Sequence, residues 1–200
     1  SKGAATVFSP DDYYWTMGKC LEIEDVIKRH ISIMDKYDPN KNIDLLVDEW
    51  GTWWDEEPGT TPGHLFQQNT MRDAFVAALT LNIFHKYVDR IKMANIAQIV
   101  NVLQSMILTD GPKMVLTPTY HVFEMYNVHQ DATYIPLDIE CERKVVRDDR
   151  IVPMLSATAS KDNDGLVHIS LANVNLEESQ TVSIDLDGIK NKAVTGRILV

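Results

Sequence analysis

Residues 43–51, with the sequence IDLLVDEWG, decide the fold class of this chain. The apolar run lacks the alternation of a half-exposed strand. It therefore predicts a strand buried on both faces, as in a parallel sheet covered by helices. Ligands meet such folds at the carboxyl ends of the strands. Glu49 lies at that end, beside a tryptophan suited to a flat ligand, and is a candidate glycosidase carboxylate. The alternative is that Asp48 and Glu49 only cap a loop.

Helical patterns lie on both sides of this strand. Residues 9–12 (SPDD) combine an N-cap serine, a proline at the first helical position and acids in the first turn, which predicts a helix start. The helical spacing continues to Asp38-Pro39, where proline disfavours helical geometry in the preceding residue. Alternating helices and strands imply parallel strands with helical crossovers. The further expected elements are a helix over about 65–89, a strand over 91–96, a helix or loop over 97–108, and a helix over 117–129.

The pattern changes after about residue 131. Apolar residues alternate at period two over 167–171 and 182–186, and Asp162-Asn163-Asp164-Gly165 predicts a hairpin turn. Residues 194–200 also fit a strand. This part therefore predicts an antiparallel all-β region. Two parallel strands cannot close a sheet, and three or four strands rarely complete a sandwich. The N-terminal residues 1–3 (SKG) also lack an initiator methionine, so we expect the chain to be a piece of a longer protein.

The composition narrows the classes of partner. The net charge is −10 and the Lys and Arg residues are scattered, which disfavours nucleic acids and anionic membranes and suits a neutral substrate. No apolar run approaches the 18 residues of a membrane span. Cys20 and Cys141 fall in no metal or CxxC pattern, and Cys20 is expected to be packed in a helix.

The sequence lacks the motifs of nucleotide-binding proteins and of serine hydrolases. It contains no GxGxxG, no GxxxxGK[ST] and no GxSxG motif. The histidines at 30, 64, 85 and 129 lack neighbours with metal-ligand spacing, so we interpret them as structural. We therefore predict no metal and no cofactor. The acids of the 51–64 loop, Asp55, Glu56 and Glu57, are interpreted as solvated rather than catalytic.

Retaining glycosidases need two carboxyl groups, a nucleophile and a proton donor. Adjacent strand residues point to opposite faces, so Asp48 and Glu49 cannot both face one site. Asn95, Gln98 and Asn101 surround the end of the second strand. Such amides either read sugar hydroxyls or satisfy local backbone groups, and the residues alone do not separate the two roles.

Five blocks of the sequence closely resemble glycoside hydrolase family 51 α-L-arabinofuranosidases. The first two belong to the family's nucleophile region. The blocks are residues 46–54 (LVDEWGTWW), 57–60 (EPGT), 67–74 (QQNTMRDA), 93–104 (MANIAQIVNVLQ) and 116–123 (LTPTYHVF). The resemblance implies α/β plus all-β architecture: the last part of a (β/α)8 TIM barrel over residues 1–130, followed by part of an antiparallel, jelly-roll-like β-sandwich over 131–200.

The resemblance also implies an activity, the release of terminal α-L-arabinofuranosyl groups from arabinose-containing oligosaccharides and polysaccharides with retention. It implies Glu49 as nucleophile, Trp53 rather than Trp50 as a wall of the sugar pocket, and Gln98 as a substrate hydrogen-bond donor. The family's acid/base glutamate follows an asparagine, and no Asn-Glu pair occurs in this sequence. We therefore expect the isolated chain to be inactive.

The family is commonly oligomeric, so a homo-oligomer is expected, a hexamer being one arrangement. An enzyme of imported oligosaccharides is expected in the cytoplasm. The N-terminus of the encoded protein is not visible, so a periplasmic or secreted location stays open. Two alternatives remain for the function: a related retaining glycosidase acting on a xyloside or glucan, and an inactive carbohydrate-binding or structural fragment.

Overall fold

The computed structural model describes residues 2–188 and 193–200, so Ser1 of the N-terminal segment lies outside it. The first half consists of helices α1 (Pro10–Leu21), α2 (Ile23–Tyr37), α3 (Met71–Lys86) and α4 (Pro118–Tyr126) with strands β1 (Leu45–Trp50), β2 (Ile91–Ile96), β3 (Ile107–Asp110) and β4 (Lys113–Leu116). The second half contains the short 3-10 helices η1 (Asn127–His129) and η2 (Arg147–Asp149) and strands β5 (Thr133–Ile135), β6 (Arg143–Val146), β7 (Arg150–Pro153), β8 (Leu155–Lys161) and β9 (Val167–Asn173).

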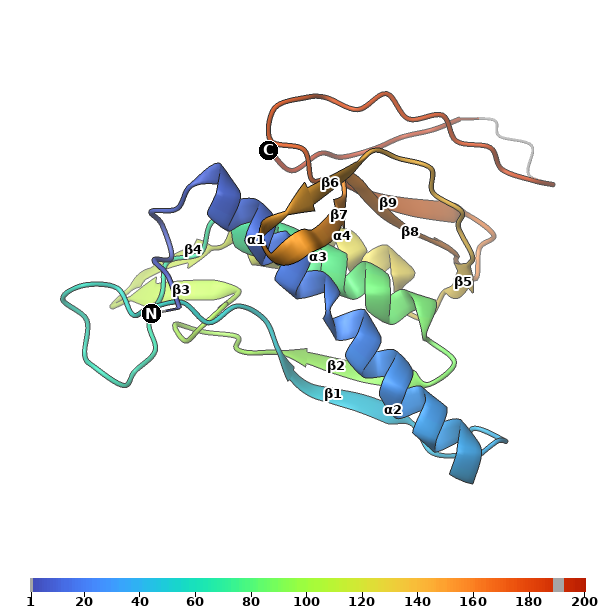
Figure 1. Cartoon of the computed structure of the whole chain (residues 1–200), viewed down its shortest axis with the longest axis horizontal. Coiled ribbons are helices and arrows are strands. Elements are labelled where there is room, and N and C mark those ends of the chain that lie inside the picture. Colours follow the sequence, from blue (N-terminus) through green and yellow to red (C-terminus); the bar gives the residue numbers. More distant parts are fainter. Residues whose placement is uncertain (1, 189–192) are drawn as a thin grey trace.

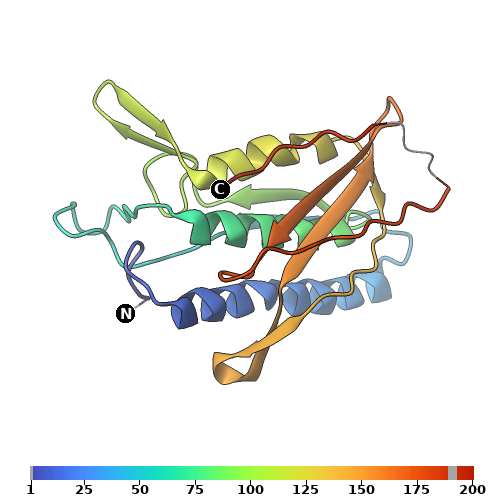
Figure 2. The same ribbon diagram turned by 90° about the horizontal axis from the view of Figure 1, so that it is seen from above.

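The helices form a layer between two kinds of sheet. β1 and β2 pair in parallel on one side of this layer, and the antiparallel sheets β5-β8-β9 and β6-β7 lie on the other (Figure 1). Seen from above, α1, α3 and α4 run side by side (Figure 2), with α3 in the middle and in contact with both neighbours. No helix within the described residues has both the length and the apolarity that a membrane span needs.

The first helical region begins as predicted but is interrupted. Ser9 caps α1 through a capping box with Asp12, and the helix ends again at Tyr37, before Asp38-Pro39. Between them, Glu22 separates α1 from α2. Its N–H donates to the carbonyl of Lys19, three residues back rather than four, so the helical ladder shifts there.

Helix α3 is the centre of the core. It starts at Met71 rather than near residue 65, because Thr70 and Asp73 form a capping box. Ala77 and Phe84 pack in the cluster that covers the parallel pair, whereas Leu79 packs in a second cluster with α1 and β7. A helix buried on opposite sides joins the two layers into one unit.

The prediction that β1 is buried on both faces is wrong for this chain. Leu46 is 48% exposed, and its register partner on β2, Met93, is 51% exposed. The described helices cover only one face of the two-stranded sheet. The apolar run therefore presents its other face to solvent.

The segment between β2 and α4 forms a loop and a hairpin. β3 and β4 pair in antiparallel register, and Gly111 adopts φ +55° in their turn. The helical alternative for 97–108 is excluded because Asn101 and Leu103 have φ of 58° and 53°, outside helical geometry. The predicted third helix ends earlier than His129, at Tyr126, and continues as η1.

The antiparallel prediction holds for part of the C-terminal region. β8 and β9 form a hairpin across the turn predicted at 162–165, and β5 pairs with the other side of β8. Residues 182–186 and 194–200 form no strand, so those two predictions are wrong. Val182 is 38% and Ile184 52% exposed. Alternation at period two is insufficient without a neighbouring strand to supply the hydrogen bonds.

Candidate active site at the carboxyl ends of β1 and β2

The two parallel strands end at the same edge, which brings their following residues together. Trp50 at the end of β1 pairs with Ile96 at the end of β2. The ladder continues one step further, because the N–H of Ala97 donates to the carbonyl of Trp50 over 2.9 Å. Glu49 therefore lies beside the turn that carries Gln98, while Trp53 is three residues beyond the end of β1. The three predicted site residues belong to one edge of the sheet.

The backbone of β1 is irregular at the two carboxylates. Val47 pairs with Ala94 and Trp50 with Ile96, so three steps on β1 face two steps on β2. This extra residue falls at Asp48-Glu49, and both side chains are exposed. Strict alternation therefore cannot be used to assign the directions of the Asp48 and Glu49 side chains. The preference for Glu49 rests on the family resemblance.

The tryptophans around Glu49 divide into core and surface. Trp50 is 8% exposed, packs edge-on against Phe84 and stacks on Phe123 at centroid distances of 5.5 and 5.9 Å. Trp53 is 50% exposed. The ammonium of Lys2 lies 3.6 Å from the centre of the Trp53 ring. A sugar stacked on Trp53 would use the other face of the indole or displace this lysine.

The amides near the end of β2 have different surroundings. Gln98 is exposed. Asn101 accepts from the N–H of Thr109 over 2.7 Å and donates to its hydroxyl over 2.8 Å. Asn101 therefore has a local structural role, because its side chain ties the loop after β2 to Thr109 of β3. Asn95 on β2 is exposed like Gln98.

A buried polar network lies beneath this edge, and the sequence did not predict it. Asp73 Oδ1 accepts from the hydroxyl of Thr52 over 2.6 Å and from the indole N–H of Trp54 over 2.9 Å. Gln67 accepts from the N–H of Trp54 over 2.8 Å and donates to the Thr52 hydroxyl over 3.1 Å. These four side chains are at most 8% exposed. They hold both neighbours of Trp53 while leaving its own ring at the surface.

The acidic residues of the loop after β1 brace its backbone. Glu56 accepts from the N–H groups of Gly63 and Leu65, and Glu57 from that of Gln68. Both glutamates are half-buried rather than fully solvated, so that part of the prediction is corrected. Their oxygens serve the loop, which fits the expectation that they are not catalytic.

A pocket in the described residues lies next to Trp54. It has a volume of about 350 Å³, and its lining includes Phe8, Trp15, Trp54 and Arg72 but none of the three predicted site residues. The guanidinium carbon of Arg72 lies 3.8 Å from the centre of the Phe8 ring and 3.6 Å from that of Trp54. Burial lowers the pKa of Arg72. Lys2, whose ammonium lies over the Trp53 ring, also lines this pocket.

Cys20 and His129, two of the residues predicted to be structural, are packed, whereas His30 and His64 are exposed. Cys20 contacts the Thr80 hydroxyl at 3.2 Å, and burial raises the pKa of its thiol to about 11. His129 contacts the hydroxyls of Ser160 at 2.7 Å and Ser170 at 2.8 Å. Among the residues that the structure describes, no group of three His, Cys, Asp or Glu side chains is arranged to hold a metal ion.

The chain resembles known arabinofuranosidases in sequence and fold. Residues 48–200 match the α-L-arabinofuranosidase C-terminal domain family. An intracellular exo-α-L-arabinofuranosidase of Bacteroides ovatus is 69% identical over the whole chain, which spans 39% of that protein. The crystal structure of the glycoside hydrolase family 51 (GH51) arabinofuranosidase from Xanthomonas axonopodis pv. citri aligns with a TM-score of 0.83 at 50% identity, covering 86% of this chain and 35% of that one.

A third relative is the α-L-arabinofuranosidase of Thermotoga maritima, solved as an arabinose complex. It aligns with a TM-score of 0.63 at 25% identity and covers 82% of this chain and 36% of its own. The matched segments thus span little more than a third of each relative's length. The family match, the Bacteroides relative and the Xanthomonas structure agree with one another: the chain belongs to the glycoside hydrolase family 51 arabinofuranosidases and corresponds to their C-terminal portion.

Proposed function

We propose that this sequence supplies the nucleophile half of a retaining α-L-arabinofuranosidase active site, with Glu49 as the nucleophile. The observation that carries the proposal is the shared edge of β1 and β2. There the exposed carboxylate of Glu49 lies beside the exposed Gln98 turn and the Trp53 loop. A charged acceptor, a flat apolar surface and an amide are the groups that a pentose site combines.

The proposed mechanism proceeds by two displacements. The Glu49 carboxylate attacks the anomeric carbon, the glycosidic bond breaks, and a covalent arabinosyl-enzyme forms. Water then attacks the same carbon from the opposite face and releases arabinose with retention. A second carboxyl group about 5–5.5 Å away must protonate the leaving oxygen and later deprotonate the water. No Asn-Glu pair supplies it in this sequence, so we propose that the 200-residue chain alone is inactive.

The architecture follows from the same proposal. β1 and β2 would be neighbouring strands of a (β/α)8 barrel, and the exposed faces of Leu46 and Met93 would point into its interior. Residues 1–130 would form the last part of this barrel, and residues 131–200 part of a β-sandwich. The substrate would be an arabinofuranosyl-containing oligosaccharide, and the enzyme a homo-oligomer. An intracellular location is proposed from the Bacteroides relative's name.

The test uses the full-length enzyme and an aryl α-L-arabinofuranoside. Glu49→Ala should lower turnover by several orders of magnitude, and azide should restore part of it by forming the glycosyl azide of inverted configuration. Asp48→Ala is the matched control, because both carboxylates are exposed at the same bulge. Full turnover in Glu49→Ala, or azide rescue in Asp48→Ala instead, would overturn the assignment. Aryl xylosides and glucosides assayed in parallel test the choice of sugar.

A further inference from the structure

The side chain of Gln104 is fully buried and forms hydrogen bonds with three residues. Its Oε1 accepts from the N–H of Thr52 over 2.8 Å. Its Nε2 donates to the carbonyl of Asp73 over 2.7 Å and to the hydroxyl of Thr119 over 3.1 Å. The residue is 0% exposed. One side chain therefore joins the loop after β1 to the first turns of α3 and α4.

The backbone of Gln104 reaches the other strand end. Its N–H donates over 3.2 Å to the carbonyl of Ala97, the residue before Gln98. Ala97 in turn donates its own N–H to Trp50, the residue after Glu49. Gln104 thus contacts both segments that extend the sheet at the candidate active site.

Gln104 packs so closely against the loop after β1 that the loop has little conformational freedom. A Cβ placed on Gly51 would lie 3.2 Å from Gln104 Oε1 and 3.5 Å from Gln104 Cβ. Gly51 and Thr52 connect Trp50 at the end of β1 to Trp53, so the loop bends directly against the glutamine. An aliphatic side chain of similar size would fill the space but would leave the N–H of Thr52 buried without its acceptor.

We propose that Gln104 is a positioning residue for the arabinofuranosyl site. Its side chain sets the path of the loop that presents Trp53, and its backbone sets the turn that presents Gln98, so it fixes the spacing between the two. The inference rests on the proposed function, because the positioned groups matter only if they contact the sugar. A displacement of these groups by about 1 Å is enough to cost on the order of a hundredfold in rate.

The test compares two buried amides in the full-length enzyme. Gln104→Leu should raise KM and lower kcat/KM for an aryl α-L-arabinofuranoside at least tenfold. Asn82→Leu is the matched control: Asn82 is 1% exposed and bonds to Ser156 and Tyr126, at the far end of α3 from the site. It should lower the melting temperature without changing KM. Unchanged KM in Gln104→Leu, or an equal rise in Asn82→Leu, would overturn the proposal.

A double-mutant cycle separates positioning from general destabilisation. If Gln104 acts through Trp53, Gln104→Leu should have a much smaller effect on KM in a Trp53→Ala background. Fully additive effects would contradict the proposal. Should Gln104→Leu fail to fold, Gln104→Glu keeps the acceptor for Thr52 and loses the donor, and the same cycle applies to it. Glu49→Ala tests the nucleophile separately, since the cycle requires only that the enzyme cleaves the glycoside.

Discussion

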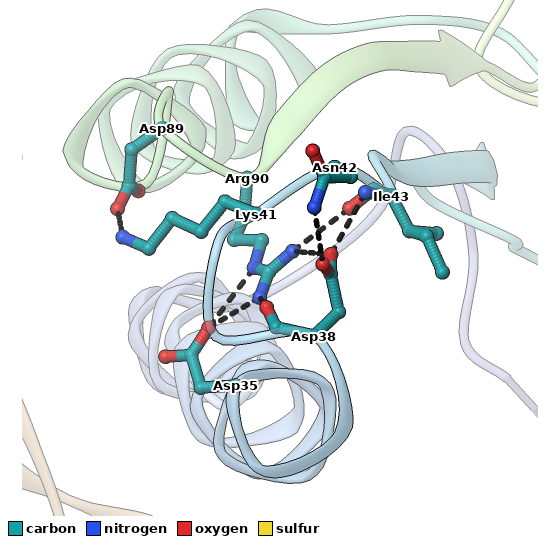
Figure 3. Close-up of polar contacts among 7 residues, drawn as sticks. All are labelled: Asp35, Asp38, Lys41, Asn42, Ile43, Asp89 and Arg90. Carbon is teal, nitrogen blue, oxygen red and sulfur yellow. Dashed lines mark hydrogen bonds and ion pairs between the residues drawn. The ribbon is translucent and has the colours of Figure 1, made fainter.

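Arg90 donates from Nη1 to Oδ2 of Asp38 over 2.8 Å and thereby joins the start of β2 to the end of α2 (Figure 3). The same guanidinium donates to Asp35 and to the carbonyl of Ile43, just before β1. The side chain of Arg90 is completely buried. This cluster therefore aligns the amino ends of the two strands whose carboxyl ends form the candidate site.

Replacing this arginine should destabilise the fold more than replacing an exposed cation nearby. Arg90→Met removes the cationic partner of Asp38, which keeps only the N–H of Ile43 and the amide of Asn42 as donors. It also removes the guanidinium donor to the Ile43 carbonyl. Breaking a buried pair costs far more than breaking a surface one. Lys41 pairs with Asp89 at the surface, so Lys41→Met should change the free energy of unfolding by no more than about 1 kcal/mol. Urea unfolding of the full-length enzyme measures both, and equal losses would contradict a structural role for the Arg90 cluster.

The two tryptophans near Glu49 should separate stability from substrate binding. Trp50→Ala removes a ring packed between Phe84 and Phe123 and should cost about 3–5 kcal/mol of stability. Trp53→Ala removes a half-exposed ring and should leave the melting temperature nearly unchanged while raising KM roughly tenfold. Thermal melts and steady-state kinetics check both. A Trp53→Ala enzyme with the KM of the wild type would remove Trp53 from the sugar site.

The sequence predicted where the two parallel strands end, because the pattern that marks a strand end is local. The β1 run and the β2 run, each followed by polar residues, predicted one shared edge and thus the neighbourhood of Glu49 and Gln98. The network beneath was not predictable this way, because Asp73 and Gln104 lie 31 residues apart in sequence and meet only when α3 packs. The only signal for them in the sequence was that both residues lie in blocks that resemble the family.

Two errors have a common physical origin. The alternation argument for Asp48 assumed a regular ladder, and the bulge at this position breaks it. The strand expected at 182–186 assumed that alternation implies pairing, yet no strand forms there. In both places the outcome depends on the neighbouring strand, and a single segment contains no information about its partner.

The stability of the full-length enzyme should fall at mildly acidic pH. Burial, together with the charges of His85 on α3 and His168 on β9, lowers the pKa of His129 to about 4. In the unfolded chain His129 takes up a proton as the pH falls through about 6.5, whereas in the folded chain it does so only near pH 4. Stability is therefore complete above pH 6.5 and is lost as pH falls towards 4, by at most about 3 kcal/mol.

His129→Gln tests this origin because it keeps a hydrogen-bonding group but cannot titrate. The variant should lose much of the decline in melting temperature between pH 6.5 and 4. The neighbouring His85 also has a pKa lowered by burial, so part of the decline should remain. An undiminished decline in the variant would assign the acid sensitivity to other groups.

Gly51, which follows Trp50, should be more important for activity than the other glycines of this loop. Gly51 has φ +133°, which an L side chain adopts only with strain, and a Cβ there would press on Gln104 Oε1. Gly51→Ala should therefore shift the Trp53 loop and lower kcat/KM. Gly59 has φ +81°, but nothing lies within 4 Å of a Cβ added to it. Gly59→Ala carries the backbone strain alone and should cost some stability with kcat/KM unchanged. If both variants lose activity equally, strain in the loop rather than the contact with Gln104 controls the site.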